Sequence, residues 1–512
     1  MTAAIPVIRR GSRSQRGEGG RAVLAAFLVL LLVACVPLVS TVLPPLVDYP
    51  NHLARLHLIA EGGNQYYAVR WAPLPDLAAD LVVPPLARLI PLAVAGKLFL
   101  ALTFALIAGG ALALNRAATG AWRLWPLLAF ALVYSRILLW GFLNYLFGLG
   151  VALCGLALWL ALERRPGWRL PLSLAVALAC FFSHLAAFGV YALAIVGVEL
   201  PPVLRLLRDG RAAAAAARAG VAALQFVGPA IILFCFAPAA PAGPLGYAPW
   251  RKADLLFSVF DNYSRPFDIA CFALLIALFA GLAWRRRLAI DPRLGLAAAL
   301  VFAAYLLLPS QMLTGSGADR RLPVALFALV VAATAPLPLP RRTALSIGIA
   351  AGVLFAVRMA VIEAVWLKSD AVYAGDIAAL DRLPEGARLA VAYPAGDVHA
   401  GDIPLLHVAT LAAARREAFV PTLFAYAGQQ PIALRPPVAA LAGATSPNWL
   451  WSGLVEGDAA TLAASAPVLR DYDFVVFTDR RPFAVPSRPC LRALPSPADF
   501  RVFALDHTAP CG

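Results

Sequence analysis

The sequence predicts a polytopic α-helical membrane protein with a small α/β domain at its C-terminal end. Of the 512 residues, 61% are hydrophobic and 14% are charged, whereas about 25% of the residues of a soluble domain are charged. Apolar runs of about 20 residues, long enough to cross a bilayer as a helix, recur along most of the chain. Arginines gather in the short segments between these runs, as they do in the cytoplasmic loops of membrane proteins.

The net charge of +15 therefore indicates contact with a membrane and not binding of nucleic acid, because the arginines lie between apolar runs. Five of the seven cysteines lie within apolar runs, where cysteine behaves as a small core residue. The abundance of Ala, Leu, Arg and Pro is typical of a GC-rich bacterial genome. We therefore expect a multi-pass protein of the bacterial inner membrane.

The apolar runs divide the chain into three segments. Residues 1–20 hold four arginines and are predicted to be a disordered, basic cytoplasmic tail, which places the N-terminus inside. Residues 21–368 are the predicted transmembrane domain, with about eleven spans and external loops at 44–83, 239–265 and 310–321. Residues 369–512 are predicted to be an extracytoplasmic α/β domain.

Residues 170–203 lie between two basic segments, which the positive-inside rule places in the cytoplasm. A single crossing cannot begin and end on the same side. The stretch is therefore predicted to be a hairpin of two short spans that turns near Ser183 and His184, with His184 near the external face. The alternative is one long tilted helix, after which every later orientation is inverted. We favour the hairpin because it agrees with the charges of the later loops.

The last segment differs in kind, because its apolar runs are shorter and its charges and prolines are more frequent. Local patterning predicts strands at 388–392, 474–477 and 501–505, and helices at 404–415 and 459–464. Cys490 and Cys511 are the two cysteines of this segment, and either a disulfide or two free thiols is compatible with the sequence. His399 and His407 stand alone in the sequence, and we assign them no role.

Polar residues gather directly after the first span, at 48–55. Asp48 can cap a helix that has a proline in its first turn. At about 100° per residue, Asp48, Asn51, His52 and Arg55 then share one helix face. A carboxylate can act as a general base or hold a divalent cation such as Mg²⁺ or Mn²⁺, and Asp48 and His52 could hold a metal together. The alternative is a surface helix whose polar face meets water and lipid headgroups.

Other predicted external segments also carry polar side chains. Asn144 lies in a short turn between two spans, and His184 lies at the turn of the hairpin. A glycine-containing loop ends in three charged residues, Asp319, Arg320 and Arg321. The planar guanidinium of arginine suits phosphate, since it donates hydrogen bonds in pairs. The alternatives are a turn-forming asparagine, a buried histidine with satisfied hydrogen bonds, and arginines that contact lipid headgroups.

With these residues, the chain resembles the GT-C class of membrane glycosyltransferases. The resemblance covers the layout of the whole chain: many spans, an acid in the first external loop and a C-terminal extracytoplasmic domain. It implies transfer of a hexose or pentose from a polyprenyl-phosphate-linked donor to a glycan, lipid or protein acceptor on the outer face. Asp48 corresponds to the acid of the first loop, as general base or metal contact.

On this interpretation Asp48 and His52 are the candidate catalytic residues. The candidate substrate-binding residues are Arg55, Asn144, His184, Asp319, Arg320 and Arg321. Two other functions stay open. A transporter or flippase of lipid-linked saccharides would favour ionisable groups at mid-membrane and duplicated halves. A non-catalytic assembly protein would use its exported domain to bind a partner, with Asp48 as a helix cap.

Overall fold

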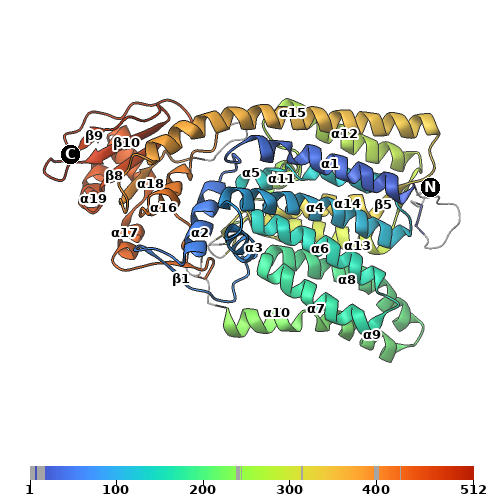
Figure 1. Ribbon diagram of the computed structural model, residues 1–512. Coiled ribbons are helices and arrows are strands. Elements are labelled where there is room, and N and C mark those ends of the chain that lie inside the picture. Colours follow the sequence, from blue (N-terminus) through green and yellow to red (C-terminus); the bar gives the residue numbers. More distant parts are fainter. Residues whose placement is uncertain are drawn as a thin grey trace. The chain divides into compact units, whose positions relative to one another are not determined.

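Figure 1 shows the computed structural model of the chain, coloured along the sequence. The structure describes residues 6–8, 18–237, 243, 245–312, 315–396, 403–426 and 428–511. The chain folds into two compact units. Unit 1 comprises Met1–Leu38, Pro73–Ala78 and Leu98–Ile362, and unit 2 comprises Val39–Ala72, Ala79–Lys97 and Glu363–Gly512.

Apolar helices of spanning length confirm the predicted polytopic helical membrane fold. In the described part of the chain, seven helices are long and apolar enough to cross a bilayer, or eight if the bent pair Ala212–Leu224 and Val227–Phe236 forms one span. The seven are α1 (Gly20–Ser40), α4 (Leu92–Thr119), α6 (Leu143–Ala161), α7 (Pro166–Ser183), α8 (Leu185–Arg208), α12 (Arg265–Trp284) and α15 (Arg341–Leu380).

In the described part of the chain, three further predicted spans correspond to shorter apolar helices. The first is broken into η1 (Trp125–Leu132) and α5 (Arg136–Trp140), and the others are α13 (Pro292–Leu307) and α14 (Leu322–Ala333). Most side chains of α14 are buried, and α14 packs against α13 and η1. Its apolar run therefore fills the interior of the bundle.

The remaining elements of unit 1 are short. They are α9 (Ala212–Leu224), α10 (Val227–Ile231), η2 (Ile232–Phe236), η3 (Pro249–Arg251), α11 (Lys252–Phe257), β2 (Leu288–Ile290), β3 (Gln311–Met312), β4 (Gly315–Ser316), η4 (Asp319–Arg321) and β5 (Thr334–Pro336).

The predicted hairpin is present as two helices, α7 and α8, that break at His184. The backbone of His184 is extended (φ −170°, ψ 136°), and its side chain accepts a hydrogen bond from the N–H of Ala186. An imidazole nitrogen thus satisfies one of the N–H groups that a helix start leaves without an intrahelical partner. The basic flanks correctly indicated a break, while the side of the membrane on which it lies stays a prediction.

The helix α8 is central to the packing of unit 1, where it contacts α6, α7, α9 and α13. Two glycines allow the helices to approach closely. A Cβ atom on Gly148 of α6 would lie 2.7 Å from the Cβ of Ala187, and one on Gly197 of α8 would lie 2.4 Å from the Cα of Ala297 in α13. Larger side chains at these two positions would force the helices apart.

Unit 2 contains a four-stranded sheet with the order β6-β8-β10-β9. β6 (Leu389–Ala392) runs parallel to β8 (Phe474–Thr478), whereas β10 (Phe500–Leu505) pairs antiparallel with β8 and with β9 (Leu491–Ala493). The three strands predicted from the sequence are therefore confirmed. Cys490, next to β9, forms a disulfide with Cys511.

Helices of unit 2 pack on this sheet and beside it. They are α2 (Tyr49–Glu61), α3 (Ala78–Ala87), η5 (Val408–Thr410), α16 (Leu411–Arg415), α17 (Val438–Ala444), α18 (Pro447–Trp451), η6 (Ser452–Glu456) and α19 (Ala459–Leu469). The helix predicted at 459–464 is confirmed, whereas the one predicted at 404–415 begins later, as a 3-10 turn followed by α16. A second sheet pairs β1 (Tyr67–Val69) with β7 (Ile432–Leu434).

Candidate functional site

Asp48 occupies the N-cap position of α2 in unit 2, as predicted. Among the described residues, however, its side chain makes no capping hydrogen bond to the helix. Its Oδ1 instead lies 3.4 Å from the Nε2 of His407, and these side chains are 14% and 10% exposed. The carboxylate is thus directed at an imidazole from a distant segment.

The amide of Asn51 links this imidazole to the loop after α16. Asn51 is fully buried, and its Nδ2 lies 3.2 Å from the Nδ1 of His407 and donates to the carbonyl of Thr422 at 2.8 Å. The N–H of Phe424 donates to Oδ1 of Asn51 at 2.8 Å. The polar face predicted for the opening helix is therefore buried against unit 2's own loop.

His407 is the site residue that the sequence did not reveal, because no neighbouring residue marks it. Burial lowers the pKa of His407 from 6.5 to about 4, so the imidazole is neutral at pH 7. The ring of Phe424 meets His407 edge-on with centroids 5.1 Å apart, and meets His52 in the same way at 5.8 Å. His52 and His407 thus both contact the ring of Phe424, so His52 lies near the Asp48–His407 pair.

Arg55 does not present its charge to a ligand in this structure. Its Nε and Nη2 donate to the two oxygens of Asp80 at 2.9 and 3.0 Å, and both side chains are 0% exposed. A bidentate pair of this kind holds α2 against α3. The sequence placed Arg55 on the polar face correctly but gave no sign of Asp80, which comes from a largely apolar helix.

In unit 1, three of the predicted segments come together. The ring of His184 meets that of Tyr145 edge-on at 5.7 Å, and the hydroxyl of Tyr145 donates to the carbonyl of Arg321 at 2.6 Å. Burial, and then the positive charge of Arg321, lower the pKa of His184. Asn144 donates to the carbonyl and to Oδ1 of Asp76, at 2.8 and 3.0 Å.

The charged triplet in η4 divides into one acid and two arginines with different surroundings. Asp319 is buried and accepts from Lys252 at 2.7 Å and from Ser310 at 2.9 Å, so its charge is neutralised within the protein. The guanidinium of Arg321 lies 4.2 Å from the ring centroid of Phe142, and that of Arg320 lies 5.4 Å from that of Trp140. Aromatic rings therefore orient both arginines.

Among the described residues, the donors near Asp48 do not form a recognisable metal site, and the possible cation stays a prediction. Among the residues that the structure describes, no three His, Cys, Asp or Glu side chains come close enough to hold one. The nitrogen that faces Asp48 belongs to His407, whose other ring nitrogen is engaged by Asn51. We therefore assign no reaction step to Mg²⁺ or Mn²⁺.

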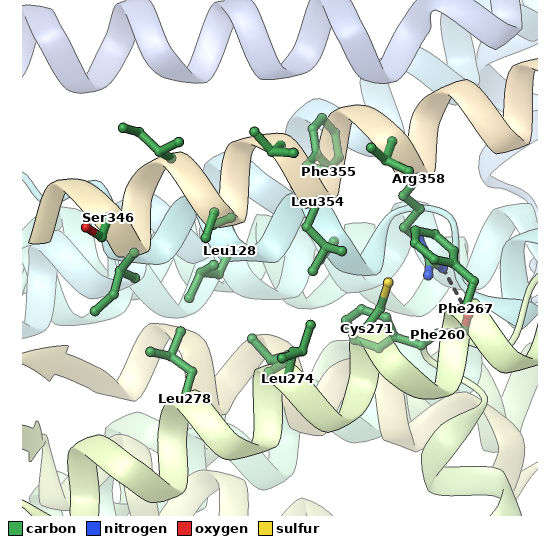
Figure 2. A pocket seen from close by; sticks show the side chains of 18 residues that line it. Leu128, Phe260, Phe267, Cys271, Leu274, Leu278, Ser346, Leu354, Phe355 and Arg358 are labelled. Carbon is green, nitrogen blue, oxygen red and sulfur yellow. Dashed lines mark hydrogen bonds between the residues drawn. The ribbon is translucent and has the colours of Figure 1, made fainter. Parts of the chain in front are cut away.

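An apolar cavity of about 760 Å³ lies between α12 and α15 in unit 1. Figure 2 shows side chains such as Leu274, Leu278 and Leu354 along it, with Arg358 at one end. Arg358 is paired with Asp268 at 3.0 Å, and it donates to the carbonyls of Tyr134 and Phe260. The charge at the cavity's end is thus already balanced, and the cavity offers an apolar surface.

No protein-family model and no curated protein matches the sequence, but two solved structures are similar to it. One is the single-particle cryo-EM structure of arabinofuranosyltransferase AftD from Mycobacteria, with 16% identity and a TM-score of 0.49; the match covers 96% of this chain and 40% of AftD. The other is the crystal structure of ArnT from Cupriavidus metallidurans bound to undecaprenyl phosphate, with 14% identity and a TM-score of 0.48, covering 95% and 98%. The chain therefore spans 40% of the length of AftD.

Proposed function

We propose that the protein is a membrane glycosyltransferase that moves a sugar from a polyprenyl-phosphate-linked donor to an acceptor on the extracytoplasmic face. One observation carries the proposal. The carboxylate of Asp48, at a helix N-cap, makes no capping bond among the described residues and lies against a buried imidazole. A carboxylate that only terminated a helix would accept from the first N–H groups of that helix.

Asp48 acts as the general base in this proposal. It takes the proton of the acceptor hydroxyl as the hydroxyl oxygen bonds to the anomeric carbon of the donor sugar. The bond between that carbon and the phosphate oxygen breaks, and polyprenyl phosphate leaves with the electron pair. Within unit 1, Arg320 and Arg321 are proposed as phosphate-binding side chains, because a guanidinium donates paired hydrogen bonds to phosphate oxygens.

The other candidate residues receive supporting roles or none. His52 is assigned to orient the substrate next to Asp48. Asn144 stays a candidate for substrate binding within unit 1, and His184 fixes the start of α8. Arg55 and Asp319 are left out of substrate binding, because each is buried in an ion pair. Pairing of this kind leaves neither charge available to a phosphate or a sugar.

The proposal is tested with Asp48→Asn in the source bacterium, after deletion of the gene and complementation. We expect Asp48→Asn to abolish one envelope glycan or glycolipid that the wild-type gene restores, since an amide cannot accept the proton. Asp458→Asn is the matched control, because Asp458 caps α19 with a genuine bond to the N–H of Thr461. The readouts are mass spectrometry of the envelope glycans and the amount of protein in the membrane.

Two results would contradict the proposed glycosyltransferase activity. An unchanged glycan with Asp48→Asn, together with loss of a co-purifying partner, would indicate an assembly protein. Accumulation of the complete lipid-linked saccharide on the inner leaflet in the deletion strain would indicate a flippase. Loss of the glycan with Asp48→Asn at normal protein level, and its retention with Asp458→Asn, supports the transferase.

A further inference from the structure

We propose that His407 is a positioning residue for Asp48, locked by Asn51 in its Nε2–H tautomer, and that it holds the carboxylate without carrying the proton itself. The inference rests on the proposed function, in which Asp48 is the base. It concerns a residue for which the sequence offered no role. It follows from the hydrogen bonds of Asn51 and from the contact between His407 and Asp48, all within unit 2.

The orientation of the Asn51 amide is the first step. A backbone N–H can only donate, so the 2.8 Å contact of the Phe424 nitrogen identifies the acceptor oxygen of the amide. The other terminus is then the NH₂ group. One of its hydrogens points to the carbonyl of Thr422, and the second is left for the Nδ1 of His407 at 3.2 Å.

The tautomer of His407 follows from that orientation. Nδ1 faces an N–H donor and must offer its lone pair, so the single proton of the neutral ring lies on Nε2. Nε2, the nitrogen that carries the proton, lies 3.4 Å from Oδ1 of Asp48. A second proton on Nδ1 would set two N–H groups against each other in a site from which water is largely excluded, since Asn51 and His407 are both buried.

The contact of Nε2–H with the Asp48 carboxylate defines what His407 contributes to the reaction. It favours the charged form of Asp48 and limits rotation of the carboxylate, as partners of catalytic side chains commonly do. The proton taken from the acceptor stays on Asp48, because His407 cannot accept it at Nε2, which is already protonated, or at Nδ1, which Asn51 occupies. His407 is therefore a fixed donor and not a proton relay.

The test uses the full-length protein with three substitutions, His407→Gln, His407→Asn and His407→Leu. The amide nitrogen of Gln reaches the place of Nε2 and can donate to Asp48, whereas the shorter Asn reaches the place of Nδ1 only, and Leu donates nothing. The probe is N,N′-dicyclohexylcarbodiimide, which modifies protonated carboxyl groups, and the readout is the mass of the peptide that contains Asp48 at a series of pH values.

We expect the pH of half-modification of Asp48 to rise by about one unit in His407→Leu and His407→Asn, because the charged carboxylate loses a donor. His407→Gln should remain close to wild type. In the complementation assay, His407→Gln should restore the glycan, and His407→Leu should lower its amount about tenfold or more. A residue that only fills space would leave the labelling of Asp48 unchanged in all three variants.

The outcomes separate the inference from the proposed function. Loss of the glycan in His407→Gln as severe as in His407→Leu, with normal protein level, would make His407 a proton carrier and overturn the inference. Unchanged labelling of Asp48 in all variants would also overturn it. An unaltered glycan in Asp48→Asn overturns the proposed function instead, and the labelling experiment still reports whether His407 controls the carboxylate.

Discussion

Asp48 and His407 differ in how well the sequence alone predicts that they belong to one site. Asp48, Asn51 and His52 could be grouped because they lie within one helix and follow its period. His407 could not, because the contact with Asn51 joins residues 356 positions apart, and no local pattern marks such a contact. For Arg55, the sequence predicted that the side chain lies on the polar face of the helix. It did not predict the buried ion-pair partner, Asp80.

The protonation of His407 gives a prediction for stability. Its pKa is lowered from 6.5 to about 4 on folding, so between these values the unfolded chain binds more protons than the folded one. Stability is therefore highest above pH 6.5 and falls as the pH decreases toward 4, by up to about 3 kcal/mol from this residue. In His407→Gln, this contribution to the loss of stability at low pH should be absent.

The measurement is thermal unfolding of the purified protein in detergent between pH 4 and pH 7.5. The difference between the melting temperatures of wild type and His407→Gln should change in favour of the variant as the pH falls. A constant difference across this range would mean that folding does not change the pKa of His407.

The sequence predicted some features of the helices better than others, for a physical reason. An apolar run of the right length marks a helix that avoids water, but it does not say whether lipid or protein surrounds that helix. For α14 the surroundings are other helices, and the run is shorter than a bilayer requires. The break between α7 and α8 was found because charges on both flanks constrain the number of crossings, which is a stronger signal than apolarity.

Close helix packing around α8 gives a second prediction. Gly197→Ala should destabilise the protein by about 1–3 kcal/mol, because the added Cβ would lie 2.4 Å from the backbone of Ala297. Gly189→Ala, in the same helix, is the matched control. A Cβ there meets nothing within 4 Å among the described residues, so alanine's better helix propensity should leave stability equal or raise it by up to about 1 kcal/mol.

Thermal melting followed by circular dichroism in detergent measures both variants. Equal melting temperatures for Gly197→Ala and Gly189→Ala would show that α8 and α13 do not approach as closely as the structure indicates.

For the chain as a whole, the sequence predicted the kind of protein but not the pairing of strands that lie far apart in the sequence. The first external loop was assigned to the transmembrane domain, but β1 from that loop pairs with β7 in the last third of the chain. Strand pairing between distant segments depends on register and on tertiary packing, which hydropathy does not encode. The positive-inside rule supplies the orientation, which stays a prediction.

That orientation can be measured with single cysteines. Asp458→Cys lies on an exposed residue of unit 2, and Arg208→Cys lies on an exposed residue at the end of α8. A membrane-impermeant maleimide applied to intact spheroplasts should label Asp458→Cys and not Arg208→Cys, with the wild-type protein as background. Labelling of Arg208→Cys before lysis would invert the predicted topology of the hairpin.

The two halves of unit 2 lie far apart in the sequence. Unit 2 can therefore fold completely only late in translation. The ribosome makes the segment with Asp48 early, but β7 and His407 follow more than 300 residues later. Until then the nascent α2 has neither its imidazole nor the loop that buries it. A prematurely terminated product that ends within the membrane bundle therefore carries the acid without its partner, and a bicistronic gene split before β6 offers a way to supply the two halves separately.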